Sequence, residues 1–328
     1  MEIALPIIWF IVGLVLLIKG GDWFVDGATS IAHRFHIPEL LIGATVVSIG
    51  TTLPEVMVSA TSAFTGHGEI AYGNAIGSII CNTSLIAAIT IAIRPAKVDR
   101  KAIVLPVIFF FSAAAFYATI AYTTGFFSRL VGIALLAIFA VYMTLSIVKA
   151  LKRNPTDLSE ITDNAEENAK ASPLWKDLLF LVLGAALIAV GADLLVDNGT
   201  IIAGFLGVPE SVIALTFVAL GTSLPELVTA ITSLVKGHGA LSVGNIIGAN
   251  LFNLVLVSGV ATTISPFPIP ASKEIAGINT SLLVDIPVMF AVMALMTIPT
   301  LIRGKLSRWQ GILLLAIYAG FCVFQFVI

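Results

Sequence analysis

Two glutamates lie in matching surroundings inside apolar stretches of this 328-residue sequence. Glu55 ends the run Gly-Thr-Thr-Leu-Pro-Glu, and Glu226 ends the related run Gly-Thr-Ser-Leu-Pro-Glu. An ionised side chain at the middle of a membrane costs at least ~2.5–3.5 kcal/mol, and such residues mark ion pathways where they occur. No Lys or Arg lies at a matching depth in either stretch. The missing positive charge therefore has to be a bound cation or a proton.

Side chains that carry oxygen accompany both glutamates. Thr51 precedes Glu55 by four residues, so both lie on one face of a helix, and Ser48 and Thr52 are related in the same way. The next apolar stretch repeats this spacing with Asn74, Ser78 and Asn82, and the second half does so with Asn245, Ala249 and Asn253. Calcium takes about 6–8 oxygen ligands, whereas zinc and copper favour Cys and His. This pattern therefore favours a hard cation such as calcium or sodium.

A helix break is expected close to each glutamate. Pro54 lacks a backbone N–H, and its ring obstructs the carbonyl group of Gly50 four residues earlier. Carbonyl oxygens freed at membrane depth need a partner, and a dehydrated sodium or calcium ion would supply one. Asn74 and Asn245 keep two interpretations, as cation ligands or as caps of a break.

The polar landmarks of the chain recur at a constant offset of 171 residues, which relates Asp22 to Asp193, Glu55 to Glu226 and Asn82 to Asn253. Each half has five apolar stretches, an odd number, so the second half has to cross the membrane in the opposite sense. Inverted repeats with interrupted helices are a transporter architecture, with the binding site near the midplane. A duplicated bundle without transport is the alternative, but it gives no reason to retain carboxylates at membrane depth.

Composition places most of the chain in a lipid bilayer. Hydrophobic residues make up 58% of the sequence and charged residues 11%, against about 25% charged residues in soluble proteins. A membrane-crossing helix needs ~20 mostly apolar residues, and ten such crossings are expected. The predicted fold is an all-α membrane protein of ten transmembrane helices, as two inverted five-helix repeats with broken core helices. Residues 1–151 form the first half, residues 152–173 an acidic cytoplasmic linker and residues 174–328 the second, inverted half.

The distribution of basic residues sets the expected orientation. With the N-terminus outside, the inner loops carry 14 of the 17 Lys and Arg residues, whereas the outer loops carry only Arg129 and Lys273. Cytoplasmic loops are enriched in Lys and Arg, so a multi-pass protein of the cell membrane with both termini on the extracytoplasmic side is expected. The net charge of −2 does not indicate a nucleic-acid partner. The sequence does not set an oligomeric state, and a monomer is compatible with it.

The doubled Gly-Thr-[Thr/Ser]-Leu-Pro-Glu run, followed in each half by Gly-Asn-x-Ile-Gly, resembles the alpha repeats of the calcium/cation antiporter superfamily, and above all the prokaryotic sodium/calcium exchangers. The resemblance implies antiport of calcium against sodium by alternating access at one central set of sites, without a resident cofactor. It implies that Glu55 and Glu226 bridge the calcium site and also serve sodium. The other ligands that it implies are side-chain oxygens of Thr51, Thr222, Thr52, Ser223, Ser78, Asn82 and Asn253 and backbone oxygens of Ser48 and Ala219.

Two departures from the family pattern bear on coupling. Asn253 stands where the potassium-dependent branch carries an aspartate, so no potassium requirement is expected. Ala249 replaces a serine of many second repeats, which removes one sodium-ligand hydroxyl and leaves a proton-coupled calcium/cation antiporter as the alternative. The proton-coupled branch often has His inside its motif, where this chain has Thr52-Leu53 and Ser223-Leu224, and this favours sodium. An enzyme is not expected, because all four His residues lie in loops.

Overall fold

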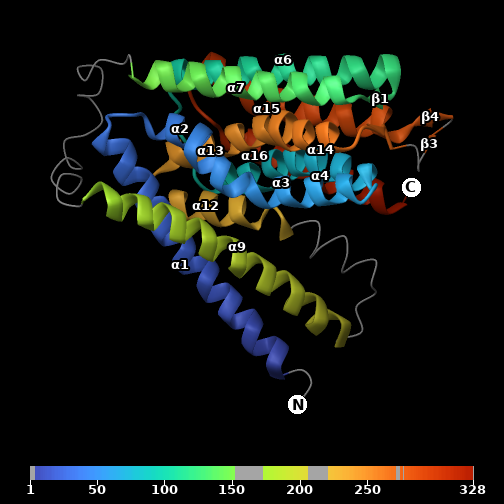
Figure 1. Cartoon of the computed structure of the whole chain (residues 1–328). Helices are drawn as coiled ribbons and strands as arrows, with labels where there is room; N and C mark the ends of the chain where they lie inside the picture. The colour runs from blue at the N-terminus through green and yellow to red at the C-terminus, as the bar shows by residue number, and fades with distance from the viewer. Residues whose placement is uncertain (1–3, 152–172, 206–220, 271–273, 276, 328) are drawn as a thin grey trace.

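The computed structural model describes residues 4–151, 173–205, 221–270, 274–275 and 277–327, and helices dominate these ranges (Figure 1). The first half consists of α1 (Ala4–Arg34), α2 (Glu39–Ile42), the π-helical turn η1 (Gly43–Val47), α3 (Ser48–Phe64), α4 (Gly68–Cys81), the π-helical turn η2 (Asn82–Ala87), α5 (Ala88–Ile93), α6 (Arg100–Thr124), β1 (Phe126–Phe127) and α7 (Arg129–Leu151). The second half consists of α9 (Leu174–Phe205), α12 (Leu224–Val235), α13 (Gly239–Phe252), η5 (Asn253–Val257), α14 (Ser258–Ile264), β2 (Phe267–Pro268), β3 (Glu274–Ile275), β4 (Ile278–Asn279), η6 (Ser281–Asp285), α15 (Ile286–Arg303) and α16 (Arg308–Val327).

Nine helical stretches of the described residues are long and apolar enough to cross a membrane, so the chain is an all-helical, multi-pass membrane protein. The tenth expected crossing, Pro209–Gly237, lies partly outside the described residues, and its described part contains α12. The first crossing is long, because α1 continues through Asp22 and Asp26 to Arg34. Of the expected linker 152–173, only Pro173 lies inside the described residues.

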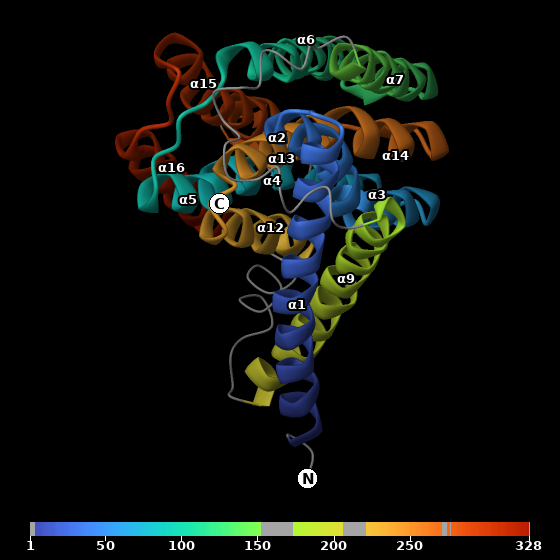
Figure 2. The ribbon, with the colours of Figure 1, turned by 90° about the vertical axis from the view of Figure 1, so that its left-hand side faces the viewer.

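The helices form layers around a central pair of segments. In Figures 1 and 2, α6 and α7 cover one side of the bundle, whereas α1 and α9 cross on the other side and project away from the rest. Most residues of the segment Gly239–Ile264 are buried, whereas few residues of Leu174–Ile202 are. The segments Glu39–Phe64, Gly68–Ile93 and Gly239–Ile264 are therefore the ones at the centre of the molecule.

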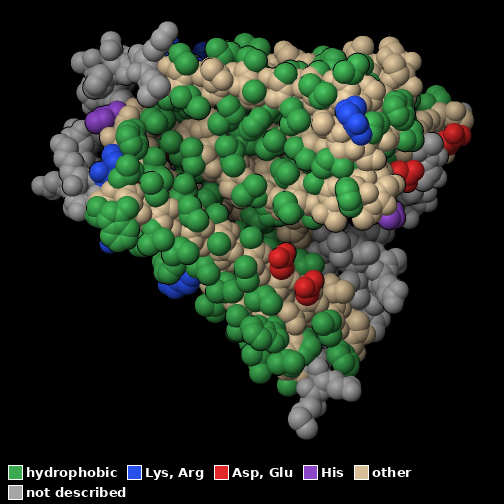
Figure 3. Space-filling view, in the orientation of Figure 1, with side chains coloured by type: hydrophobic (Ala, Val, Ile, Leu, Met, Phe, Trp, Pro, Cys, Tyr) green, Lys and Arg blue, Asp and Glu red, His purple; other side chains and the backbone are tan. Residues whose placement is uncertain are grey.

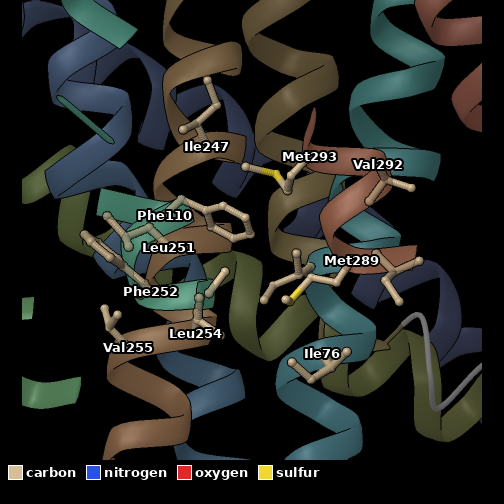
Figure 4. Packing of buried hydrophobic residues seen from close by; sticks show 14 of the residues in the cluster. Ile76, Phe110, Ile247, Leu251, Phe252, Leu254, Val255, Met289, Val292 and Met293 are labelled. Carbon is tan, nitrogen blue, oxygen red and sulfur yellow. The ribbon is translucent and has the colours of Figure 1, made fainter. Parts of the chain in front are cut away.

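An apolar cluster holds the central helices in place (Figure 4). Phe252, the last residue of α13, meets Phe139 and Tyr142 of α7 edge-on, with ring centroids 5.1 and 6.0 Å apart. Met289 and Met293 of α15 are fully buried in the same cluster. Because η5 begins directly after Phe252, this packing fixes the position of Asn253.

Glycines form the contact between α1 and α9. A Cβ atom added at Gly20 would lie 2.8 Å from the backbone nitrogen of Ile188 and 2.9 Å from the carbonyl oxygen of Gly184. A Cβ atom at Gly13 would lie 2.9 Å from the carbonyl oxygen of Gly191. Small residues let membrane helices approach closely, so these two helices pack backbone to backbone.

Short backbone pairings join the halves at the two ends of α6. Beyond its last turn, β1 and β2 pair antiparallel, with Phe127 opposite Phe267. Before its first turn, Lys97 forms an antiparallel bridge with Lys305. The broad face in Figure 3 is covered by hydrophobic side chains, and Lys and Arg gather at its left edge, where α1 ends. Such an apolar face suits contact with lipid.

Candidate functional site

The two sequence-predicted glutamates are fully buried in the described structure. Glu55 lies within α3, one residue after Pro54, and Glu226 lies in the first turn of α12, one residue after Pro225. The N-terminus of a helix carries a partial positive charge that favours a carboxylate, so Glu226 receives support from its own helix. Glu55 sits mid-helix and lacks this support.

The carboxylates carry uncompensated charge. None of the four carboxylate oxygens of Glu55 and Glu226 has a hydrogen-bond partner among the described residues. Burying an ion costs several kcal/mol unless it is paired and hydrogen-bonded. A site of this kind requires a cation or protons to be stable, as expected from the sequence.

The threonines beside the glutamates reach across the interface between the halves. Thr51 Oγ1 donates a hydrogen bond to Asn245 Oδ1 at 3.2 Å, and Thr222 Oγ1 donates to Asn74 Oδ1 at 3.4 Å. The 171-residue offset converts one pair into the other. Each asparagine oxygen thereby accepts the hydrogen of a threonine hydroxyl. The lone pairs of that threonine oxygen remain available to a cation.

Asn74 and Asn245 lie inside α4 and α13, so their interpretation as caps of a helix break is wrong. Asn74 Nδ2 donates to the carbonyl oxygen of Glu55 at 3.1 Å and to Ser59 Oγ at 2.8 Å. This contact ties the backbone of the glutamate to the neighbouring helix. Both asparagines therefore orient other groups of the site.

Several other predicted ligands are buried and have polar side-chain atoms without a hydrogen-bond partner among the described residues. Within the described part of the chain, this holds for the hydroxyl oxygens of Thr52 and Ser223 and for the amide Oδ1 and Nδ2 atoms of Asn82 and Asn253. Asn82 is the first residue of η2, and Asn253 is the first residue of η5. π-helical turns of this kind are frequent at functional sites. Ser78 of α4 is also buried, and it lies one helical turn before Asn82.

Two predicted backbone ligands have different outcomes. Ser48 is buried at the start of α3, and its hydroxyl contacts the carbonyl oxygens of Gly43 at 2.7 Å and Asn245 at 2.9 Å. Ala219 lies outside the described residues. The ligand roles of all the predicted residues stay predictions.

The expected break between Gly50 and Pro54 is wrong for the first half, because α3 continues from Ser48 to Phe64 with Pro54 inside it. The backbone widens one turn earlier, in η1, where Gly43 packs directly against the carbonyl oxygen of Leu241. Side chains satisfy carbonyl groups of η1: Tyr142 donates to Ala44 at 2.9 Å, and the Ser48 hydroxyl contacts Gly43. In the second half, the described backbone turns at Thr222 and Ser223 before α12 begins.

One buried polar link next to the site was not predicted. Asn250 Nδ2 donates to Thr83 Oγ1 at 2.7 Å and contacts the sulfur of Met293 at 3.1 Å. Thr83 follows Asn82 directly, and Asn250 precedes Asn253 by one helical turn. The repeat conceals this pair, because the 171-residue offset relates Asn250 to Ile79 and Thr83 to Leu254. An isolated Asn within an apolar run was the only available signal.

The donor set is hard and oxygen-based. The described residues contain no group of three or more His, Cys, Asp or Glu side chains that could hold a metal ion. Hydroxyl, amide and backbone oxygens would therefore have to complete the coordination of an ion bound by the two carboxylates. Such an oxygen ligand set suits calcium and sodium.

The fold and the buried anionic centre together define a multi-pass membrane protein of the cation-transporter class. Residues 5–148 and residues 176–327 each match the protein family described as sodium/calcium exchanger protein. The chain belongs to this family, which confirms the resemblance drawn from the two glutamate motifs.

Known relatives match most of the chain. The sodium/calcium exchanger MaX1 of Methanosarcina acetivorans is 30% identical over 349 residues, which cover 97% of each chain. The inner membrane protein YrbG of Escherichia coli is 39% identical over 261 residues, 78% of this chain and 79% of YrbG. The solved structure of the sodium-calcium exchanger NCX_Mj, soaked with sodium and strontium, is similar with a TM-score of 0.78, at 32% identity and 97% coverage of each chain.

Proposed function

We propose that this chain exchanges calcium for sodium across the cell membrane, by alternating access at the buried carboxylate pair. The observation that carries the proposal is the set of unpartnered, buried oxygens around Glu55 and Glu226. Family membership and the likeness to named sodium/calcium exchangers support sodium as the coupling ion over a proton. The chain acts as a transporter and not as an enzyme.

Charge balance explains why exchange would result. Two ionised glutamates carry two negative charges, which one calcium ion or two sodium ions neutralise. Simultaneous occupancy by both kinds of ion would leave excess positive charge in a medium of low dielectric constant, so the ions compete. If only the neutralised site crosses the barrier between the two faces, each ion moves only in exchange for the other.

An inverted relation between the halves is supported by pairs of contacts that exchange under it. The Thr51–Asn245 and Thr222–Asn74 hydrogen bonds form one such pair. The two backbone pairings that join the halves form another, since β1 follows α6 and pairs with the segment after α14, whereas Lys305 follows α15 and pairs with the segment after α5. Both halves also match the same family. In this arrangement, the two glutamates approach the midplane from opposite sides.

The moving part in this proposal is the pair α1 and α9. These helices pack on each other through glycines and project from the bundle (Figure 2). Arg34 at the end of α1 also pairs with Asp177 at the start of α9, with 3.0 Å between Nη2 and Oδ2. A unit joined in this way can slide along the central helices and open the site to one face at a time.

The orientation follows from the basic residues, with the ends of α1 and α12 on the cytoplasmic side and both chain termini outside. Lys236, which follows α12, contacts Asp26 of α1 at 2.7 Å on that cytoplasmic side. A protease-cleavable tag placed before α1 tests this orientation in intact cells, because an external protease removes the tag only if the N-terminus lies outside.

Calcium uptake into sodium-loaded proteoliposomes tests the exchange itself. Dilution of the vesicles into sodium-free buffer should drive uptake of radioactive calcium, and Glu55→Gln should abolish it. Glu274→Gln is the matched control, because Glu274 is an exposed carboxylate in β3, outside the site. Uptake that ignores the sodium gradient and follows a pH gradient would contradict sodium coupling and support the proton-coupled alternative.

A further inference from the structure

The two halves differ in charge at the end of the helix that carries each central glutamate. Lys236 is the C-cap of α12, and Thr65 is the C-cap of α3. The offset of 171 residues relates these two positions to each other. A cation is favoured at the C-terminus of a helix, and only the second half places one there.

Lys236 contacts two carboxylates of α1. Its Nζ lies 2.7 Å from Asp26 Oδ1 and 3.4 Å from Asp22 Oδ1, and it donates to the carbonyl oxygen of Asp22 at 3.1 Å. The two aspartates are four residues apart and lie on one face of α1. Because an ammonium group has three N–H donors, one lysine can bind both carboxylates and tie the end of α12 to α1.

The corresponding place in the second half has two carboxylates but no cation. Asp193 and Asp197 of α9 are the counterparts of the two α1 carboxylates. Neither forms an ion pair within the described part of the chain, and the sequence that follows α9, residues 206–220, contains no Lys, Arg or His. The hydroxyl of Thr65 forms hydrogen bonds within the last turn of its own helix. The ion pairs of Lys236 therefore have no equivalent in the other half.

The packing of the helices differs in the same way. A Cβ atom added at Gly21 of α1 would lie 2.7 Å from Val228 Cγ1 and 2.9 Å from Thr232 Oγ1 of α12. The counterpart of Gly21 is Ala192 of α9, whose own Cβ atom occupies the space that such an approach requires. Thr232 precedes Lys236 by one helical turn. The close contact and the ion pairs therefore form one continuous seam between α1 and α12.

This seam covers a route to the central site. Glu226 lies in the first turn of α12, and Lys236 lies at the end of this helix. The seam begins at Val228, two residues after the glutamate, and extends to the face at which α12 ends. A displacement of α1 along α12 breaks the contacts of Lys236, so these contacts oppose opening of the site at this face.

We propose that Lys236, Asp22 and Asp26 form a one-sided latch, which holds the site closed at the face where α12 ends. The latch rests on the proposed movement of α1 and α9, and it makes the two access states unequally populated. The site then opens more readily at the opposite face. In this assignment Lys236 is a positioning residue, which acts on the equilibrium between the two states and not on the ions.

Exchange of residues between the halves tests the latch. Lys236→Thr gives the second half the residue of the first half and breaks the latch. Thr65→Lys places a cation beside the two carboxylates of α9 and creates a latch at the other face. The apparent affinity for an ion rises with the fraction of the protein that is open to it. In proteoliposomes of known protein orientation, each variant should therefore lower the calcium concentration for half-maximal exchange at the α12 face by about two- to fivefold, the range of a part-exposed ion pair.

The same variants should raise the half-maximal calcium concentration at the opposite face, and high salt should weaken both shifts because it screens the charges. The double variant should give the product of the two single shifts, since the two positions are independent. Lys305→Thr is the matched control, because it removes an exposed lysine for which the described residues contain no carboxylate partner. The proposal is overturned if Lys236→Thr behaves as this control does, or if it shifts calcium dependence in the same direction at both faces.

Hydrogen exchange of backbone amides, measured on purified protein without calcium or sodium, separates the latch from transport. Lys236→Thr should speed amide exchange in α12 and slow it in α3, because the population moves from one access state to the other. Faster exchange in both helices, as a structural defect would give, or an unchanged pattern would refute the latch even if the parent protein exchanges calcium for sodium. The expected pattern in a parent protein that fails to exchange these ions would refute the proposed function alone.

Discussion

Replacement of Glu226 by Gln should change the stability of the protein in opposite directions with and without calcium. The side chain is fully buried, and neither of its carboxylate oxygens has a hydrogen-bond partner among the residues that the structure describes. In cation-free buffer, Glu226→Gln removes one of two buried charges that repel each other, and it keeps the volume. Burial of a charge costs several kcal/mol per ion in lost hydration, and a neutral amide of the same shape does not carry this cost. The cation-free variant should therefore melt at the same temperature as the parent or higher.

Calcium reverses the order. At a concentration of about 100 Kd, a ligand that binds only the folded protein stabilises it by about 2.7 kcal/mol. Loss of one partner from a buried charge pair costs about 3–5 kcal/mol, which lowers calcium affinity by about 10²-fold or more. The same calcium concentration is then at most about equal to the Kd of the variant, and the stabilisation falls to about 0.4 kcal/mol or less.

The assay is thermal unfolding of the detergent-solubilised protein over a calcium titration, with Glu274→Gln as the matched control. The control removes an exposed carboxylate and should retain the full calcium response. A Glu226→Gln protein that is less stable without cations and keeps the calcium response would refute the reasoning. Such a result would mean that Glu226 is a structural group whose partner is not a cation.

Three further predictions concern the parts around the carboxylates. Gly20→Ala should slow exchange with little effect on calcium affinity, because the new Cβ atom would lie 2.8 Å from the backbone of α9 and disturb the contact between α1 and α9. Gly320→Ala is the control and should leave the exchange rate unchanged, because nothing lies within 4 Å of its added Cβ atom. Thr83→Val should lower the melting temperature, because it leaves the Asn250 amide without its acceptor at 2.7 Å, at a cost of about 1–3 kcal/mol. Addition of Asn250→Leu should recover part of this loss. Strict additivity of the two changes in a double-mutant cycle would contradict the link. Lys236→Met should change stability by less than about 1 kcal/mol, because its partners are half exposed, and a larger loss of melting temperature would contradict this estimate.

The repeat made the central site the most predictable part of the molecule. One offset of 171 residues singled out both glutamates and both asparagines at the start of the π-helical turns η2 and η5. The residue types alone indicated a hard cation, because buried carboxylates without basic partners need positive charge. The helical class and the membrane location followed from composition for the same physical reason, which is that lipid can replace water only around an apolar surface.

Details that depend on contacts between the halves were not predictable. The position of η1 is set by the close approach of Gly43 to α13, and Gly43 has no special neighbours in the sequence. A proline signals a possible break, but α3 accommodates Pro54 within a continuous helix. The Asn250–Thr83 bond and the ion pairs of Lys236 with α1 each join segments that are far apart in the chain. Such features depart from the repeat, so the offset that revealed the glutamates conceals them.

Asn245 and Asn74 explain how neutral side chains can favour a cation at the central site. A threonine hydroxyl can donate one hydrogen bond and accept two. Since Asn245 and Asn74 receive the hydrogens of Thr51 and Thr222, these threonines can offer only oxygen lone pairs to an ion between the glutamates. In the proposed site, Asn82 and Asn253 would add amide oxygens without adding charge. The proposed ligand set would therefore hold its charge at −2 while it increases the number of oxygens, and this combination would match one calcium ion or two sodium ions.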